Sequence, residues 1–310
     1  MIDSRLFVFS LLFACPALSR GCPDGSLLSD KVWTWGYVLD RTPSACPFVT
    51  VKTSTVKTDW SLEREIAFLG AKRQTFYMNS MFNRDYVRKH FPGWDEECFT
   101  NCIDTKLSDA HFARLSDVGE VWCALEHGNR TASAEAIAWL SLRHRNIAGL
   151  NLDDFNNGME ATKMSPAELK ELRERIRAIN PALKIAVVTY AHPPNEFDMT
   201  PFAPYVDVVS RWCWKPRHDF WDNYKAEIAR LRKQVGSRPK VIQGLYIRDF
   251  GTSLQDPRPM PIDIFRKSVK TVRAAMLDGA IDGVIVPQAG WFGAPEHAAH
   301  VKLLKEAFRR

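Results

Sequence analysis

The feature that most constrains this chain is a regular alternation of short apolar runs with longer segments of helical period. Eight runs rich in β-branched and aromatic residues occupy residues 32–38, 71–78, 118–126, 147–153, 183–191, 206–214, 240–247 and 281–288. Runs of this length that are bounded by polar turns indicate buried strands. Between them the spacing of apolar residues predicts helices over 61–70, 108–117, 133–145, 165–179, 220–235 and 262–279. Ser165 with Pro166 predicts a helix start, and Gly236 and Gly279 predict helix ends.

This order of elements predicts an α/β protein built as a (β/α)8 barrel of the TIM type. No glycine-rich phosphate fingerprint follows the first strand, which argues against an open, doubly wound sheet. No linker or low-complexity tract interrupts the pattern, so we expect a single catalytic-type domain over residues 22–310. In such barrels the active site lies at the carboxyl ends of the strands.

The first 21 residues have the pattern of a secretory signal peptide. A charged start at Asp3 and Arg5 precedes an apolar core over residues 6–14, and small or turn-forming residues follow. The apolar run is shorter than the ~20 residues that span a bilayer. We therefore expect a secreted or periplasmic protein whose mature chain has no transmembrane helix, and the alternative is a buried first helix. The residues before Cys15 and Cys22 each resemble a bacterial lipoprotein cleavage box, which leaves a lipid anchor open.

The cysteine content fits an exported protein. Cleavage after Gly21 removes one of the seven cysteines and leaves Cys22, Cys46, Cys98, Cys102, Cys123 and Cys213. An even number permits disulfides, and the spacing of Cys98 and Cys102 permits a local one. A zinc site is the weaker alternative, because no second close pair of ligands follows. The net charge of +6 comes without any basic run, so we expect no nucleic-acid partner.

Two adjacent carboxylates, Asp153 and Asp154, end the fourth strand in the segment GLNLDDF. The two-residue period of a strand places Asn151 and Asp153 on the inward face, while Asp154 begins the loop. Two neighbouring carboxyl groups do not both ionise at no cost, so their pKa values should separate. One acid and one base are what glycosidic cleavage requires.

Other polar and aromatic residues converge on the same rim. Glu126 and Asp249 are further candidate catalytic carboxylates, and aromatic faces can bind the apolar face of a sugar ring. The candidate substrate-binding residues are Trp35, Tyr77, Asn151, Tyr190, His192, Trp212, Trp214, Tyr246 and Trp291.

The LNLDDF segment resembles the strand-end Asp-Asp motif of the substrate-assisted β-N-acetylhexosaminidases, a family related to O-GlcNAcase and to hyaluronidase-type barrels. The segment VDVVSRWCWKP is similar to the tryptophan-bearing sixth strand of those enzymes. The resemblance implies that Asp153 polarises the substrate's acetamido group and that Asp154 is the general acid. The chain departs from a chitinase pattern because Phe155 stands in the place of the catalytic glutamate.

The leading hypothesis is an exported glycoside hydrolase that acts on a poly- or oligosaccharide, without a cofactor or metal. One alternative is a non-catalytic carbohydrate-binding barrel. Another is a metal-dependent hydrolase in which His127 and His192 join Asp153 and Asp249 as ligands. A structural alternative is that the aspartate pair caps the following segment, with Asp154 as the Asx-turn acceptor for Asn156 to Gly158 and Asp153 paired to a neighbouring arginine.

Overall fold

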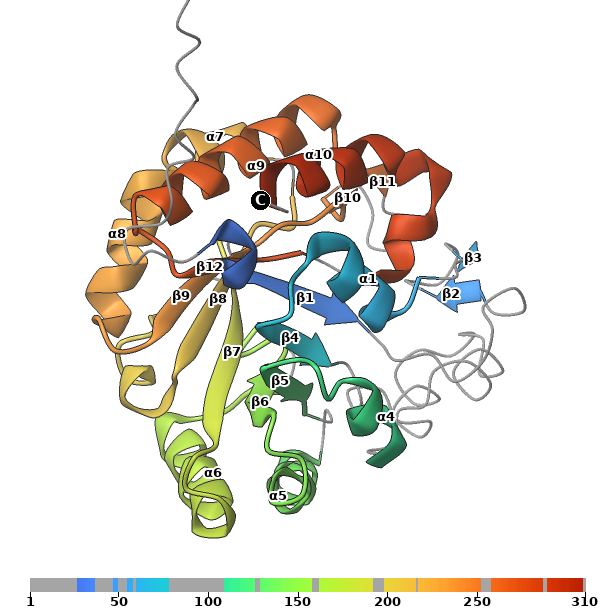
Figure 1. The fold of residues 1–310 in the computed structure, drawn as a ribbon. Helices are drawn as coiled ribbons and strands as arrows, with labels where there is room; N and C mark the ends of the chain where they lie inside the picture. Colours follow the sequence, from blue (N-terminus) through green and yellow to red (C-terminus); the bar gives the residue numbers. More distant parts are fainter. Residues whose placement is uncertain are drawn as a thin grey trace, which may run out of the picture.

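Eight parallel strands close into a barrel, which confirms the predicted fold (Figure 1). The computed structural model describes residues 27–36, 47–49, 55–57, 60–77, 109–125, 129–157, 162–191, 198–215, 217–251, 258–286 and 289–308. Around the barrel the strand order is β1-β12-β9-β8-β7-β6-β5-β4. The strands are β1 (Val32–Gly36), β4 (Gln74–Tyr77), β5 (Glu120–Ala124), β6 (Ile147–Leu152), β7 (Lys184–Tyr190), β8 (Val208–Trp212), β9 (Lys240–Gly244) and β12 (Gly283–Ile285).

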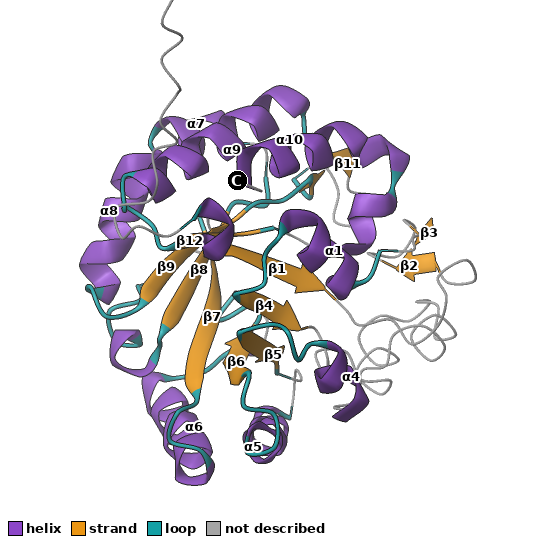
Figure 2. Cartoon of the chain, viewed as in Figure 1, coloured by secondary structure: helices purple, strands orange, loops and turns teal. Residues whose placement is uncertain are grey.

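Helices surround the strands, as Figure 2 shows. They are α1 (Leu62–Leu69), α4 (Asp109–Arg114), α5 (Arg130–Ser141), α6 (Pro166–Ile179), α7 (His218–Asp222), α8 (Tyr224–Val235), α9 (Ile262–Leu277) and α10 (Ala298–Phe308). Short 3-10 turns are η1 (Leu28–Lys31), η4 (Ala203–Tyr205), η5 (Ala289–Gly293) and η6 (Pro295–His297). Two small antiparallel hairpins pair β2 (Pro47–Val49) with β3 (Thr55–Lys57) and β10 (Arg248–Asp249) with β11 (Arg258–Pro259).

All eight predicted barrel strands are present, though most are shorter than their apolar runs. The segment predicted as one helix over 220–235 instead divides at Asn223 into α7 and α8. The hairpins and the last helix, α10, were not predicted. The helix signals were correct: Ser165 accepts the Glu168 N–H in a capping box, and Gly236 and Gly279 adopt positive φ angles of 75° and 72°.

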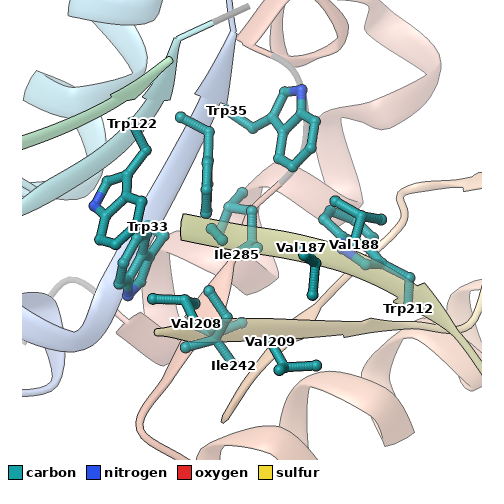
Figure 3. Close-up of a cluster of buried hydrophobic side chains, with 14 of the residues drawn as sticks. Trp33, Trp35, Trp122, Val187, Val188, Val208, Val209, Trp212, Ile242 and Ile285 are labelled. Carbon is teal, nitrogen blue, oxygen red and sulfur yellow. The ribbon is translucent and has the colours of Figure 1, made fainter. Parts of the chain in front are cut away.

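The inside of the barrel is filled by large side chains (Figure 3). The rings of Trp33 and Trp122 lie 5.5 Å apart, and those of Trp35 and Trp212 lie 5.6 Å apart. Because β1 is not a neighbour of β5 or β8, these contacts cross the interior. Gly244 makes room for one of them, since a Cβ there would overlap the Trp212 indole. The interior is thus a packed core.

Charged side chains lie at the amino-terminal ends of the strands. Lys184 and Lys240 place their ammonium groups 5.9 Å and 5.7 Å from the ring centroids of Trp122 and Trp33. Lys184 also pairs with Glu120 at 3.1 Å. These cations therefore cover the bottom of the aromatic core.

Two of the predicted disulfide candidates are free thiols. Cys123 and Cys213 are buried and unpaired, and burial raises the pKa of the Cys213 thiol to about 12. The other cysteines and the proposed leader, residues 1–21, lie outside the described residues, so export and lipid anchoring remain predictions. Within the described ranges, no helix combines the length and the apolar character needed to cross a membrane.

Candidate functional site

The turn after β6 carries both aspartates, and two of its residues have an unusual backbone conformation. Asp154 and Asn156 have φ angles of 49° and 53°, in the left-handed region. Aspartate and asparagine tolerate this region better than most residues do, but it still has a conformational cost. Asn156 stabilises the turn, because its side chain accepts the Met164 N–H at 2.8 Å and donates to the Met164 carbonyl at 3.2 Å. Phe155 is fully buried against Phe202.

The two carboxyl groups have different hydrogen-bond partners. The Asp154 N–H donates to Oδ1 of Asp153 at 2.9 Å. The Tyr190 hydroxyl, from the end of β7, donates to Oδ1 of Asp154, and the Asn157 side chain also bonds to Asp154. Neither aspartate forms an ion pair with any described basic residue. The turn-cap alternative expects Asp154 to accept a hydrogen bond from the segment 156–158 and Asp153 to pair with an arginine. The first contact is present, since Asn157 bonds to Asp154, whereas Asp153 pairs with none of the arginines that the structure describes.

These surroundings affect the pKa values of the two aspartates differently. Burial raises the pKa of Asp153 well above its ordinary value, and the negative charge of Asp154 raises it further. Burial also raises the pKa of Asp154, but the hydrogen bonds from Tyr190 and Asn157 oppose this rise. Hydrogen bonds donated to a carboxylate favour its charged form. The proton of the pair is therefore better held by Asp153.

A second tyrosine, Tyr246, extends this group of residues from the end of β9. Its hydroxyl is hydrogen-bonded to Tyr190, and it retains partial exposure. Burial raises the pKa of Tyr246 and of Tyr190, and the charges of both aspartates add to the rise for each. Both phenols are therefore neutral donors at physiological pH. The site joins side chains from the ends of β6, β7 and β9.

Asn151 lies on β6 directly below Asp153, as the strand period predicts. It is fully buried, and neither its amide oxygen nor its amide nitrogen has a hydrogen-bond partner among the described residues. Its neighbours in the sheet are Ala124 and Ala186. An unpaired buried amide costs about 1–3 kcal/mol per group. Asp249 is the second residue of the short strand β10, which follows β9, where it is buried and accepts the Gly251 N–H at 2.7 Å.

The predicted aromatic residues divide into buried and partly exposed members. Trp35, Trp212 and Trp291 are 5%, 3% and 2% exposed, which places them in the core of this structure. Trp212 donates its indole N–H to Ser210 at 3.0 Å and packs its ring 4.7 Å from Tyr246. Trp214 and Tyr246 are the partly exposed ones.

Several predicted residues cannot be placed in this site. Glu126, His127 and His192 lie outside the described residues, and for Tyr77 only the backbone is described. The metal hypothesis needs both histidines. Among the described residues no three His, Cys, Asp or Glu side chains gather around a point where an ion would fit.

Sequence reasoning missed Arg211, which lies behind the site. It is 4% exposed, and its Nη1 donates to the Tyr190 carbonyl at 2.6 Å. The sequence feature that could have revealed Arg211 is its charge within the apolar run 206–214, because both faces of that strand are expected to be buried.

The sequence matches no protein-family model, and no curated protein is similar to it. Among solved structures, the α-L-arabinofuranosidase of Thermotoga maritima is 12% identical, with a TM-score of 0.52 over 90% of this chain and 70% of that one. What the two share is the fold. The tryptophan synthase complex of Pyrococcus furiosus contains a chain with 13% identity and a TM-score of 0.47, over 90% of this chain and 96% of that one. The β-glucuronidase of Parabacteroides merdae is 11% identical, with a TM-score of 0.41, and the match spans 73% of this chain but only 28% of the glucuronidase.

Proposed function

We propose that this barrel is a glycoside hydrolase in which Asp153 is the general acid and Asp154 is the ionised partner. The observation that carries the proposal is the asymmetry of the pair. Asp153 lies in surroundings that favour its neutral form, while Tyr190 and Asn157 donate hydrogen bonds to Asp154. A neutral and a charged carboxyl group at neutral pH supply the acid and the anion of glycosidic cleavage.

In this proposal the Asp153 carboxyl group protonates the leaving oxygen as the glycosidic bond breaks, and the Asp154 carboxylate stabilises the positive charge that develops at the anomeric carbon, either directly or by orienting a substrate group. Water then forms the new bond at the anomeric carbon and passes a proton to the Asp153 carboxylate, which restores the acid. The resemblance to the hexosaminidases implies the opposite order. We assign the proton to Asp153 because the hydrogen bonds that favour a charged carboxylate converge on Asp154.

The substrate class is inferred from the surroundings of the pair. Trp214 and Tyr246 offer partly exposed aromatic surfaces at the ends of β8 and β9, which suits the apolar face of a sugar ring. The Thermotoga arabinofuranosidase is a glycosidase built on the same fold, but a fold of this kind carries many chemistries. The proposal therefore rests on the aspartate pair.

The test compares Asp153→Asn and Asp154→Asn with the unchanged protein. Release of reducing ends is measured from a panel of N-acetylated, neutral and uronic glycans, and release of phenolate from matching nitrophenyl glycosides. Asparagine tolerates the left-handed backbone at position 154, so both variants should fold.

We expect Asp153→Asn to lose at least ~100-fold on glycans, because general acid catalysis contributes about 10²–10⁴-fold. It should lose far less on nitrophenyl glycosides, because their leaving group needs no proton. Asp154→Asn should lose activity on both substrates. Glycan binding without turnover by any of the three proteins would instead indicate a carbohydrate-binding barrel. If instead Asp154→Asn keeps its activity on nitrophenyl glycosides and Asp153→Asn loses it, the general acid is Asp154.

A further inference from the structure

Two arginines bond to successive carbonyl groups at the end of β7. Arg211 Nη1 donates to the Tyr190 carbonyl at 2.6 Å, and Arg217 Nη1 donates to the Ala191 carbonyl at 2.8 Å. The Ala191 N–H in turn donates to the Trp212 carbonyl at 2.8 Å. The main chain that carries Tyr190 is therefore fixed on both its donor and its acceptor side.

The two arginines differ in their surroundings. Arg217 is partly exposed and forms two hydrogen bonds to the Asp219 carboxylate, at 2.6 and 3.2 Å. The Arg211 side chain is only 5% exposed and faces the Glu227 carboxylate at 3.8 Å, while Glu227 lies closer to Arg230, at 2.7 Å. Burying a guanidinium group costs free energy unless its donors are used. The short bond to the Tyr190 carbonyl is one such use.

We propose that Arg211 is a positioning residue, which holds the end of β7 so that the Tyr190 hydroxyl points at the Asp154 carboxylate. The inference extends the proposed function, since it takes Asp154 as the carboxylate that works in its ionised form. Arg211 lies outside the barrel and holds the main-chain carbonyl of Tyr190. The Tyr190 side chain lies on the inside and donates its hydroxyl to Asp154. Losing the outer bond allows Tyr190 to shift, and a shift of the hydroxyl weakens its bond to Asp154.

The titratable and polar groups around Asp154 come from three sides. Asp153 and Asn157 belong to its own turn, Tyr190 belongs to β7, and Tyr246 follows β9. Of these, Tyr190 depends directly on Arg211. A change at Arg211 should therefore appear at Asp154 as the loss of one hydrogen bond.

The experiment measures the pKa of Asp154 by NMR titration of protein labelled with ¹³C at the aspartate carboxyl groups, and it needs no substrate. Tyr190→Phe defines the effect of losing the hydroxyl. Arg211→Met removes the guanidinium and keeps an apolar stem. The matched control is Arg173→Met, because Arg173 is also largely buried and also bonds a carbonyl, that of Tyr205, and a carboxylate, that of Asp207, but at the amino-terminal ends of the strands.

We expect Tyr190→Phe to raise the pKa of Asp154 by about one unit, the effect of one lost hydrogen bond to a carboxylate. Arg211→Met should raise it by a large part of that amount, and Arg173→Met should not change it although it lowers stability. If Arg211→Met does not fold, Arg211→Lys is titrated, and a smaller rise is expected because an ammonium group donates from a single point. An unchanged pKa of Asp154 in the folded arginine variant would overturn the inference, as would an unchanged value in Tyr190→Phe. Shifted pKa values without turnover on any glycan would overturn the proposed function alone.

Discussion

At the scale of single residues, the surroundings of Asp153 oppose its ionisation, and this opposition lowers the stability of the fold at neutral pH. An aspartate in water loses its proton near pH 3.9, whereas burial and the neighbouring Asp154 hold the pKa of Asp153 well above that value. Asp154 adds a left-handed backbone conformation to the same short turn. Groups kept in unfavourable states often mark functional sites.

This predicts that Asp153→Asn stabilises the protein at neutral pH. Between the ordinary aspartate pKa and the raised value, the folded state binds more protons than the unfolded state, so the free energy of unfolding falls as the pH rises. Asparagine does not titrate. Urea unfolding should therefore show a gain for the variant at pH 7, and the gain should disappear toward pH 4.

Asp198→Asn is the control for this prediction, because the pKa of Asp198 is shifted in the opposite direction from that of Asp153. Hydrogen bonds from Thr200 lower the pKa of the exposed Asp198, so its native carboxylate stabilises the fold above the ordinary pKa. The control variant should gain nothing at pH 7. Equal gains for both variants would show that Asp153 is not held neutral.

At the scale of elements, the pairing of β6 with β7 leaves no room for a side chain at Gly149. A Cβ at this position would overlap the backbone carbonyl of Lys184 and would lie 3.0 Å from the Trp122 ring. A backbone atom of a neighbouring strand cannot turn away as a flexible side chain can. The close approach also sets the height at which Asp153 emerges, because the register pairs Gly149 with Lys184 and Leu152 with Val187.

Gly149→Ala should therefore destabilise the barrel by roughly 1–3 kcal/mol, the cost of overpacking in a core. Urea unfolding followed by tryptophan fluorescence measures the change. Gly70→Ala is a useful comparison, since no atom lies within 4 Å of a Cβ there and only its positive φ of 70° opposes the substitution, at a cost of about 1 kcal/mol. An unaffected midpoint for Gly149→Ala would mean that the strands can separate.

Some elements could be predicted from the sequence and others could not. The strands were predictable because strands buried on both faces form continuous apolar runs, and Asp153 was predictable because its place follows from the two-residue period. The interruption at Asn223 was not, because the sequence 220–235 keeps helical spacing on both sides of it. A difference between the two aspartates was predictable, but which of them is favoured in its charged form was not, since this depends on Tyr190, which comes from another strand.

At the scale of the whole molecule, stability depends on closure of the barrel. The first strand, β1, pairs with β4 on one side and with the last strand, β12, on the other. Near the closure, α10 packs against α9 and α1 (Figure 1). The first and the last strand of the barrel thus complete one sheet.

A chain that ends at residue 282 should fail to fold as a monomer. It lacks β12 and α10, so β1 and β9 are left as unpaired edges, and exposed parallel edges promote aggregation. Size-exclusion chromatography with light scattering, together with circular dichroism, compares it with the full chain. A monomeric truncated chain that melts cooperatively would show that closure is dispensable.

The filled interior also determines how molecules reach and leave the site. Trp33 and Trp122 occupy the barrel below the aspartates, and Lys184 and Lys240 lie at its far end. Large side chains of the described residues fill the barrel axis, so under the proposed function a glycan would lie across the strand ends and would not thread through the barrel. Under the same proposal, the product of one turnover would leave by the rim at which the substrate entered, before the next substrate could bind.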